Sequence, residues 1–326
     1  MKPEWRNWYT RATQNRVSQG MRVRVPPPAH MQKIIAVVGP TASGKSALGT
    51  YLAQKLNGEI ISADSRQVYK GLDIGTGKVT KKEMAGIPHH LLSVASPKKQ
   101  FTVDGFVKQA EKALYVILQK ARIAIVVGGT GLYVDMLLGR MAYPNVPPNL
   151  KLREQLEQQT TKQLFAQLKK LDPRRAANIE PNHKRRLIRA IEIAKAIGQS
   201  PDTRTTSTTN NKYNTLWLGL NPEYKKLKQN IRMRLFARIR TGMVAEAKRL
   251  HKQGLSYKRM AELGLEYRYL SLLLQNKITK QEFETQLERS IWQYAKRQMR
   301  WFKGNKDIRW VSGKSQALRL SKQFLS

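Results

Sequence analysis

Residues 39–46 read GPTASGKS and directly follow the apolar run IIAVV at residues 34–38. Gly39, Gly44, Lys45 and Ser46 have the spacing of a phosphate-binding loop that links a buried strand to a helix. Small residues let successive backbone N–H groups converge on an anion, and the helix adds its positive end. The stretch therefore predicts an α/β fold with a site for a diphosphate or triphosphate. An ordinary glycine-rich turn is the alternative, and the loop alone does not identify a nucleotide.

The individual residues of this loop have separate predicted roles. Lys45 would neutralise the terminal phosphates, and the hydroxyl of Ser46 would help to hold Mg²⁺. No other metal is expected, because the chain has no cysteine and its five histidines form no HxxH or HExxH pattern. The predicted diphosphate-binding residues are Gly39, Pro40, Thr41, Ala42, Ser43, Gly44, Lys45 and Ser46.

The charge of the chain points to a polyanionic partner. Its 60 Lys and Arg residues against 22 Asp and Glu residues give a formal net charge of +38. Such a field attracts phosphate-rich ligands, nucleic acid first among them. The absence of cysteine excludes disulfides and thiol catalysis and fits a reducing cytoplasm. No apolar run approaches the ~20 residues of a membrane span, so we expect a cytoplasmic protein with no membrane partner.

The pattern of apolar residues predicts a doubly wound α/β fold, with a parallel sheet like that of P-loop NTPases and helices on both faces. The expected helices are residues 46–56 and 103–121, and in the second an apolar stripe has the helical period. The expected strands are residues 34–38, 59–62, 123–127 and 215–220, with a possible short strand at 308–312, and the stripe is Phe106, Ala110, Ala113, Leu114 and Ile117.

Two linker-like segments divide the chain. The proline-rich stretch at 143–149 and the polar, low-complexity stretch at 200–212 enclose a helical interval. We expect a helical insertion at 144–207 between the third and fourth predicted strands. The α/β core then comprises residues 31–143 and 208–326, with a basic, helical C-terminal part.

The first thirty residues have no clear helical or strand period and carry five arginines. They also lack the apolar segment of a secretory signal. A basic arm that binds nucleic acid is one interpretation. We prefer a misassigned start, with translation beginning at Met31 just before the first strand, and an out-of-place translation of a tRNA gene could explain the segment. The nucleotide sequence tests this hypothesis.

A second motif, ISADSRQVYKGLDIGTGK, starts at the end of the second predicted strand, at residues 61–78. In an open α/β sheet this edge faces the ligand crevice, so Asp64 should lie near the phosphate loop. A carboxylate there could ligate Mg²⁺ or act as a general base. The alternative is a helix N-cap, since Asp64 precedes Ser65, Arg66 and Gln67 in a stretch that could begin a short helix.

A third motif, VVGGTGLYVDMLL, at residues 126–138, again places glycines after a strand. The glycines allow close approach of the backbone, and Thr130 offers a hydroxyl. A plain glycine-rich turn is equally compatible with the pattern. No Asp or Glu ends the strand, so the usual acidic partner of an NTPase loop is missing. This absence weakens hydrolysis of ATP or GTP as the function.

The three motifs, in this order, resemble those of the tRNA dimethylallyltransferase (isopentenyl-tRNA transferase) family. The resemblance extends over residues 31–310 and includes KRRLIRAIEI at 184–193, LGLEYRYL at 263–270 and YAKRQMRWF at 294–302. It implies transfer of a dimethylallyl group from its diphosphate to the exocyclic N6 of the adenosine 3′-adjacent to the tRNA anticodon, with release of diphosphate. No Cys/His zinc finger follows the core, so the bacterial form is expected.

The resemblance also implies roles for individual residues. It makes Asp64 the general base, and Thr130 and Arg153 match positions that touch the tRNA. The catalytic residues are then Asp64, Thr130 and Lys45. The residues expected to bind tRNA are Asp64, Ser65, Arg66, Gln67, Thr130, Arg153, Arg185, Arg186, Arg189, Lys296, Arg297 and Arg300. Mg²⁺ is the expected cofactor, and a monomer acting on the anticodon stem-loop is the simplest assembly.

Some details of this assignment stay open. Arg66 stands where many relatives carry an uncharged residue, and residues 263–270 differ from the commoner pattern, which affects base recognition rather than the reaction. Without the resemblance, Arg185 and Arg189 would be read as a solvated helical face over a core of Leu187, Ile191 and Ala194.

Residues 289–303 combine five Lys or Arg with four aromatics and no acid. They predict an amphipathic helix whose basic residues Lys296, Arg297 and Arg300 reach RNA phosphates. A wet basic face without RNA contact is the alternative. The side chains expected in the core are Ile291, Ala295, Met299 and Phe302.

Two other functions compete with prenyl transfer. A small-molecule kinase with a phosphate loop would turn over ATP without regard to tRNA, and it leaves the basic helices unexplained. A non-catalytic RNA-binding module explains the charge and leaves Asp64 and the phosphate loop without a role.

Overall fold

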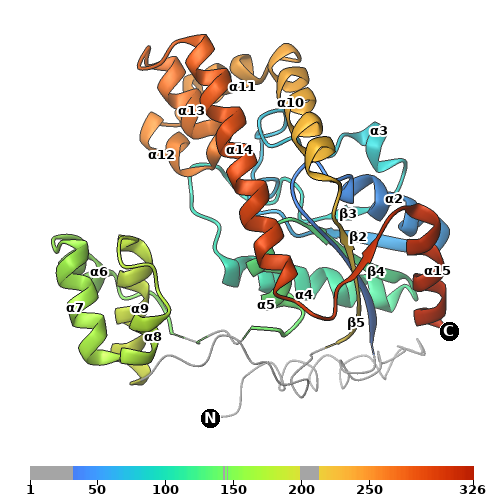
Figure 1. Ribbon diagram of the computed structural model, residues 1–326, viewed down its shortest axis with the longest axis horizontal. Helices are drawn as coiled ribbons and strands as arrows, with labels where there is room; N and C mark the ends of the chain where they lie inside the picture. The colour runs from blue at the N-terminus through green and yellow to red at the C-terminus, as the bar shows by residue number, and fades with distance from the viewer. Residues whose placement is uncertain (1–31, 142–143, 145, 199–212) are drawn as a thin grey trace, which may run out of the picture. The chain divides into compact units, whose positions relative to one another are not determined.

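A computed structural model describes residues 32–141, 144, 146–198 and 213–326 (Figure 1). The chain divides into two compact units, one formed by Met1–Leu137 with Lys212–Ser326 and the other by Leu138–Asn211. The insertion expected at 144–207 falls within the second unit. The predicted basic extension at 1–30 and the polar stretch at 200–212 lie outside the described residues.

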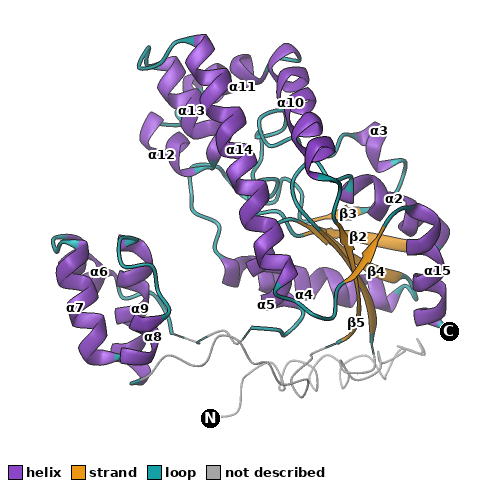
Figure 2. Ribbon diagram, viewed as in Figure 1, coloured by secondary structure: helices purple, strands orange, loops and turns teal. Residues whose placement is uncertain are grey.

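The first unit is built on a six-stranded parallel sheet of order β3-β2-β4-β1-β5-β6 (Figure 2). The four long predicted strands and the short C-terminal one are confirmed to within a residue or two at their ends. The edge strand β3 was not predicted, because two residues are too short to show a period. The strands are β1 (Lys33–Val38), β2 (Gly58–Ser62), β3 (His89–His90), β4 (Ile123–Gly128), β5 (Asn214–Leu220) and β6 (Arg309–Val311).

Helices cover both faces of the sheet because its central strands are apolar on both sides. In β1, Ile35 and Val37 pack into a cluster with α2 and α15, while the alternate residues Ile34 and Ala36, also fully buried, belong to the other face. On that other face α4 contacts β2 and β4, and α5 contacts β4. These helices are α2 (Lys45–Lys55), α15 (Lys314–Leu325), α4 (Val103–Gln119) and α5 (Gly131–Leu137).

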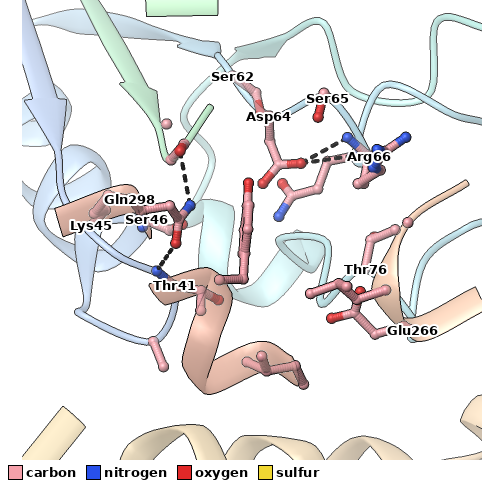
Figure 3. Close-up of a pocket in the computed structure, with 18 of the residues that line it drawn as sticks. Thr41, Lys45, Ser46, Ser62, Asp64, Ser65, Arg66, Thr76, Glu266 and Gln298 are labelled. Atoms are coloured by element: carbon pink, nitrogen blue, oxygen red, sulfur yellow. Dashed lines mark hydrogen bonds between the residues drawn. The ribbon is translucent and has the colours of Figure 1, made fainter. Parts of the chain in front are cut away.

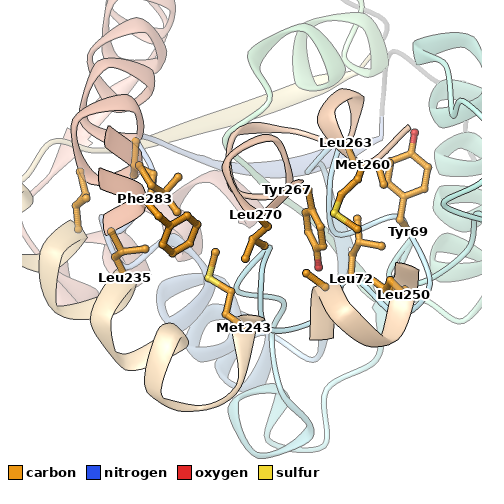
Figure 4. Packing of buried hydrophobic residues seen from close by; sticks show 14 of the residues in the cluster. Tyr69, Leu72, Leu235, Met243, Leu250, Met260, Leu263, Tyr267, Leu270 and Phe283 are labelled. Atoms are coloured by element: carbon orange, nitrogen blue, oxygen red, sulfur yellow. The ribbon is translucent and has the colours of Figure 1, made fainter. Parts of the chain in front are cut away.

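The C-terminal part of the first unit is a helical layer with its own core (Figure 4). The core contains large fully buried side chains such as Tyr267 and Phe283. The long helix α14 begins at a capping box in which Thr279 and Glu282 exchange hydrogen bonds with each other's backbone N–H. The helices of this layer are α10 (Tyr224–Arg240), α11 (Met243–Lys252), α12 (Tyr257–Glu262), α13 (Leu265–Leu274) and α14 (Lys280–Lys303), and the short α3 (Lys81–Met84) precedes β3.

The second unit is helical and packs around a small apolar cluster. Leu187 and Ile191 are fully buried and Ala194 is buried, which confirms the core face predicted for the arginine-rich helix. The cluster joins this helix, α9, to α7 through Leu164 and Leu168. The unit contains α6 (Leu150–Glu157), α7 (Thr161–Leu171), α8 (Pro173–Ala177) and α9 (Lys184–Ile197).

Candidate active site

The three glycine- and polar-rich motifs meet at one edge of the sheet. β2, β4 and β1 are neighbours, with Ser62 paired with Val127 and Val38 with Gly128, so their carboxyl ends lie side by side. A cavity of about 310 Å³ opens there and is lined by residues of all three motifs (Figure 3). This is the crevice expected at the carboxyl ends of strands in an open α/β sheet.

The phosphate loop runs from the end of β1 to the first residue of α2. Gly39 and Gly44 have φ angles of 147° and 93°, a region that favours glycine, and a Cβ on Gly39 would lie 2.6 Å from the carbonyl oxygen of Leu220. Thr41, Ala42, Lys45 and Ser46 line the cavity. The Ser43 hydroxyl is buried and has no hydrogen-bond partner within the described part of the chain. A turn of this shape that leads directly into a helix N-terminus is suited to binding an anion.

The surroundings of Lys45 make the protonation of its amine sensitive to a nearby anion. Its Nζ donates a 2.6 Å hydrogen bond to the carbonyl oxygen of Pro40. Burial lowers the pKa of Lys45 to about 7, opposed by the attraction of the Asp64 carboxylate, while Arg234 lowers it further. A diphosphate beside the amine would reverse this shift, because an opposite charge favours the protonated form.

Asp64 orders the turn that follows it, at residues 65–68, where the alternative prediction of a short helix was wrong. Its Oδ1 accepts hydrogen bonds from the backbone N–H of Arg66 at 2.8 Å and of Gln67 at 3.3 Å, as an Asp side chain does in an Asx-turn. The other oxygen has no hydrogen-bond partner among the described residues, and the carboxylate lines the cavity (Figure 3). The turn therefore fixes the side chain through one oxygen and leaves Oδ2 available to accept a proton.

Thr130 contributes to the site through Ser65. The backbone N–H of Ser65 donates to Thr130 Oγ1 at 3.1 Å, and the threonine hydroxyl donates to Ser65 Oγ at 3.4 Å. Ser65 lines the cavity and Thr130 does not. The hydroxyl of Thr130 therefore ties the segment after β2 to the segment after β4.

Helix α14 supplies cavity residues that the sequence did not identify. Tyr294 and Gln298 line the cavity together with the predicted Arg297, whereas the predicted Lys296 and Arg300 do not. Burial raises the pKa of Tyr294 to about 12, and the nearby Asp64 carboxylate adds to the shift, so the phenol stays protonated at neutral pH.

The core face predicted for α14 is confirmed except at Met299, which was expected to be buried. Ile291, Ala295 and Phe302 are buried as predicted, but Gln298 is buried in place of Met299, which is half-buried. A polar side chain is tolerated there because both ends of its amide are hydrogen bonded.

The rest of the cavity wall comes from segments far apart in the sequence. It is lined by Arg234 of α10, by Thr76 near the end of the second motif, and by Val79 and His89. The 262–268 segment also lines the cavity and contributes both negative and positive side chains, namely Glu262, Glu266 and Arg268. The sequence pattern of α10 could not identify Arg234 as a cavity residue, because four other arginines or lysines lie within six residues of it in the same helix.

The two tryptophans of α14 are held in place by other elements. Trp292 packs edge-on against Tyr224 with ring centroids 4.4 Å apart, and Lys296 lies 6.0 Å from the same indole ring. Trp301 donates its Nε1–H to Asp135 at 2.8 Å. Both rings therefore join α14 to neighbouring helices, and the basic side chains between them are left on the surface.

The predicted arginines of the second unit form a different kind of cluster. Arg153 and Arg189 both pair with Glu192, which is 2% exposed, and Arg153 does so through two nitrogens at 2.9 and 2.8 Å. Burial opposes ionisation of Glu192, but the hydrogen bonds from both arginines and from the Asn149 N–H lower its pKa. Arg185 and Arg186 are exposed, and Arg186 lies 3.5 Å from Glu180.

The metal predicted at Ser46 would need ligands from outside the protein. Within the described residues no group of three or more His, Cys, Asp or Glu could hold a metal ion. The hydroxyl of Ser46 and the carboxylate of Asp64 nevertheless line the same cavity. Such a sparse oxygen set fits Mg²⁺, which is commonly bound through one or two protein oxygens, water and substrate phosphates.

The family is settled by comparison with known proteins. Residues 67–305 match the model of the IPP transferase family. The chain belongs to the IPP transferase family. It is 38% identical over 283 residues to the tRNA dimethylallyltransferase of Anoxybacillus flavithermus, which covers 86% of this chain and 90% of that protein. It is 39% identical over 283 residues to tRNA dimethylallyltransferase 2 of Treponema denticola, covering 85% of this chain and 95% of that protein.

Solved structures of this IPP transferase family agree with the fold. The tRNA isopentenylpyrophosphate transferase of Bacillus halodurans is 34% identical and superposes with a TM-score of 0.66, covering 90% of this chain and 95% of that one. A eukaryotic dimethylallyltransferase acting on tRNA is 25% identical with a TM-score of 0.76, covering 90% and 79%. In the described part of this IPP transferase, no helix is long and apolar enough to cross a membrane.

Proposed function

We propose that this IPP transferase transfers a dimethylallyl group from dimethylallyl diphosphate to N6 of the adenosine that follows the tRNA anticodon. The observation that carries the proposal is the cavity itself, which is lined both by Lys45 and Ser46 of the phosphate loop and by the Asp64 carboxylate, whose Oδ2 has no hydrogen-bond partner among the described residues. The relatives named for this activity share more than a third of their aligned residues with the chain.

The reaction needs a base and a stabilised leaving group. The N6 lone pair attacks C1 of the dimethylallyl group, the bond between C1 and the diphosphate oxygen breaks, and diphosphate leaves. Oδ2 of Asp64 accepts the proton that N6 loses, because this oxygen has no partner and faces the cavity. The turn that binds Oδ1 keeps the carboxylate in this orientation.

The leaving diphosphate is held by the phosphate loop and its surroundings. Lys45 and the hydroxyl of Ser46 line the cavity, and with the backbone N–H groups at the start of α2 they would stabilise the negative charge that grows as the bond breaks. Arg234 lines the same cavity and adds a second cation. Mg²⁺, held by Ser46 and the donor's own phosphates, would supply further charge neutralisation.

The target base must leave the stacked anticodon loop to reach Asp64. Single-stranded loops are where RNA is recognised specifically, through stacking and through contacts with phosphate. The predicted contacts Ser65, Arg66, Gln67 and Arg297 line the cavity and would meet the flipped nucleotide. Lys296 and Arg300 would contact phosphates outside it, and Arg153, Arg185, Arg186 and Arg189 would do so from the insertion.

We also propose that one chain acts on one tRNA. The phosphate loop and the Asp64 carboxylate both belong to this chain, and both substrates bear phosphates that its net charge of +38 attracts. The cysteine-free composition and a tRNA substrate favour the cytoplasm as the place of the reaction.

A direct assay tests the proposal. Purified protein is incubated with Mg²⁺, dimethylallyl diphosphate and unmodified tRNA whose anticodon is followed by adenosine, and the nuclease digest is analysed by mass spectrometry. We expect prenylated adenosine and one equivalent of diphosphate. ATP hydrolysis that is indifferent to tRNA, with no prenylated nucleoside, would favour the kinase alternative and remove this assignment.

A further inference from the structure

Gln298 is a buried amide that joins two of the loops around the cavity. The side chain is 6% exposed and projects from α14 between the phosphate loop and the end of β4 (Figure 3). Its Oε1 accepts the backbone N–H of Thr41 at 2.8 Å, and its Nε2 donates to the carbonyl oxygen of Gly129 at 2.8 Å. Both ends of the amide are therefore used, and the orientation of the side chain is fixed.

These two hydrogen bonds are part of a longer chain. Gly129 precedes Thr130, whose hydroxyl binds Ser65, and Ser65 follows Asp64. Gln298 thus completes a hydrogen-bonded path from the phosphate loop, across the end of β4, to the turn that orients the carboxylate. The amide also packs tightly against Gly129, where an added Cβ would lie only 2.4 Å from Nε2 of Gln298.

The hydrogen bond from Thr41 to Gln298 also limits which groups of the phosphate loop can bind a diphosphate. The N–H of Thr41 is occupied by Gln298, so it serves to anchor the loop rather than to bind the donor. The side chains of Lys45 and Ser46, which line the cavity, are left for the diphosphate. The anchor therefore holds the loop in one place without competing for the ligand.

We infer that Gln298 is a positioning residue that sets the spacing between the diphosphate-binding loop and the Asp64 carboxylate. The inference rests on the proposed function, in which C1 of the donor must lie in line between the leaving diphosphate and N6. A misplacement of about 1 Å between such groups can cost ~10²-fold in rate. In the proposed reaction, Gln298 contacts none of the reacting atoms, and it acts through its hydrogen bonds to Thr41 and Gly129.

Two substitutions separate this role from ordinary packing. Gln298→Leu removes both hydrogen bonds. Gln298→Glu keeps an acceptor for Thr41 but places a carboxylate oxygen against the carbonyl oxygen of Gly129. Protonation of the glutamate restores the donor, so the ratio of the variant's rate to that of the wild type should rise as the pH falls. The matched controls are Gln281→Leu and Gln281→Glu, at an exposed position in the first turn of the same helix.

Single-turnover prenyl transfer and the dissociation constants of both substrates are measured for each variant. We expect Gln298→Leu to lose roughly 10²-fold in the transfer rate while both dissociation constants change less than about threefold. Gln298→Glu should show the pH-dependent recovery and the Gln281 variants should not. Wild-type rates for Gln298→Leu, or a ratio for Gln298→Glu that does not vary with pH, would overturn the inference.

The same experiment keeps the two proposals distinct. If the wild-type protein prenylates tRNA and the Gln298 variants do so equally well, only the positioning role fails. If the wild-type protein transfers no prenyl group, the proposed function fails first. Should Gln298→Leu not fold, the pH-dependent recovery of Gln298→Glu decides the question by itself.

Discussion

The cavity of the first unit and the arginine cluster of the second use charged groups in opposite ways. At the cavity, within the part of the chain that the structure describes, Lys45 donates to a carbonyl oxygen and Oδ2 of Asp64 has no hydrogen-bond partner. In the insertion, Arg153 and Arg189 share the buried carboxylate of Glu192. Charges left unsatisfied by the protein are available to substrates, whereas charges already paired hold side chains in place. The predictions below test this difference, beginning with the largest expected effect.

Removing the base should be the most damaging change. Asp64→Asn keeps an oxygen that can accept the N–H groups of Arg66 and Gln67 but cannot take a proton. We expect the single-turnover transfer rate to fall by roughly 10²- to 10⁴-fold. The affinity for tRNA, measured by filter binding, should stay within a few-fold. A near-normal rate would exclude Asp64 as the base, and a large loss of tRNA affinity would make its role structural.

Lys45 should make donor binding depend on pH. Its pKa of about 7 in the free protein rises when the diphosphate binds, so binding above this pH takes up a proton. Affinity for dimethylallyl diphosphate should therefore fall between about pH 7.5 and about pH 9, by up to tenfold per pH unit. Isothermal titration in buffers of different ionisation enthalpy measures the uptake.

The matched variant for this prediction is Lys45→Met. It should bind the donor roughly 10- to 100-fold more weakly, as expected for loss of a charge-assisted hydrogen bond, and its affinity should lose the pH dependence. A wild-type protein that takes up no proton, or a variant that keeps the slope, would contradict the role of Lys45.

Glu192 should matter for stability rather than for chemistry. Glu192→Gln removes the buried carboxylate that two partly exposed arginines share, and we expect a loss of about 1.5–3 kcal/mol in the stability of the insertion, as for hydrogen bonds to a charged group. Glu180→Gln is the control, because its pair with Arg186 is exposed and is worth no more than about 1 kcal/mol. Thermal unfolding compares the two variants, and equal melting temperatures would show that the buried pairing is not stabilising.

The same carboxylate should make stability depend on pH in one direction. Its folded-state pKa lies below the ordinary value of 4.5, so its stabilisation is complete above that pH and is lost as the pH falls through the folded-state pKa. Glu192→Gln should therefore flatten the acid limb of the unfolding profile.

The smallest effect is expected at the surface of the insertion. Arg185→Ala removes an exposed side chain that makes no pair with any described residue, so folding should be unaffected. If Arg185 contacts a tRNA phosphate, the slope of log affinity against log salt should fall by about one. An unchanged slope would return Arg185 to a solvated helical face.

Much of the fold could be predicted from the sequence because its signals are local. Buried parallel strands are short continuous apolar runs, and β1, β2, β4 and β5 all showed this pattern. The glycine spacing at 39–46 and the strand ends before Asp64 and Thr130 placed the cavity as well, since carboxyl ends of parallel strands meet at one edge. The two-residue strand β3 carries no period and was missed.

What only the tertiary structure decided is which side chains from distant segments complete the site. Gln298 and Tyr294 belong to a helix whose period predicts a core face, but an amide is buried only where partners exist, and Thr41 and Gly129 lie more than 160 residues away. Arg234 lies among other basic residues of α10, and only its place in the cavity wall distinguishes it from them. Local sequence determined the strands, the phosphate loop and the position of Asp64. Hydrogen bonds and charges across long sequence separations, which no local pattern encodes, decided how these parts are held together.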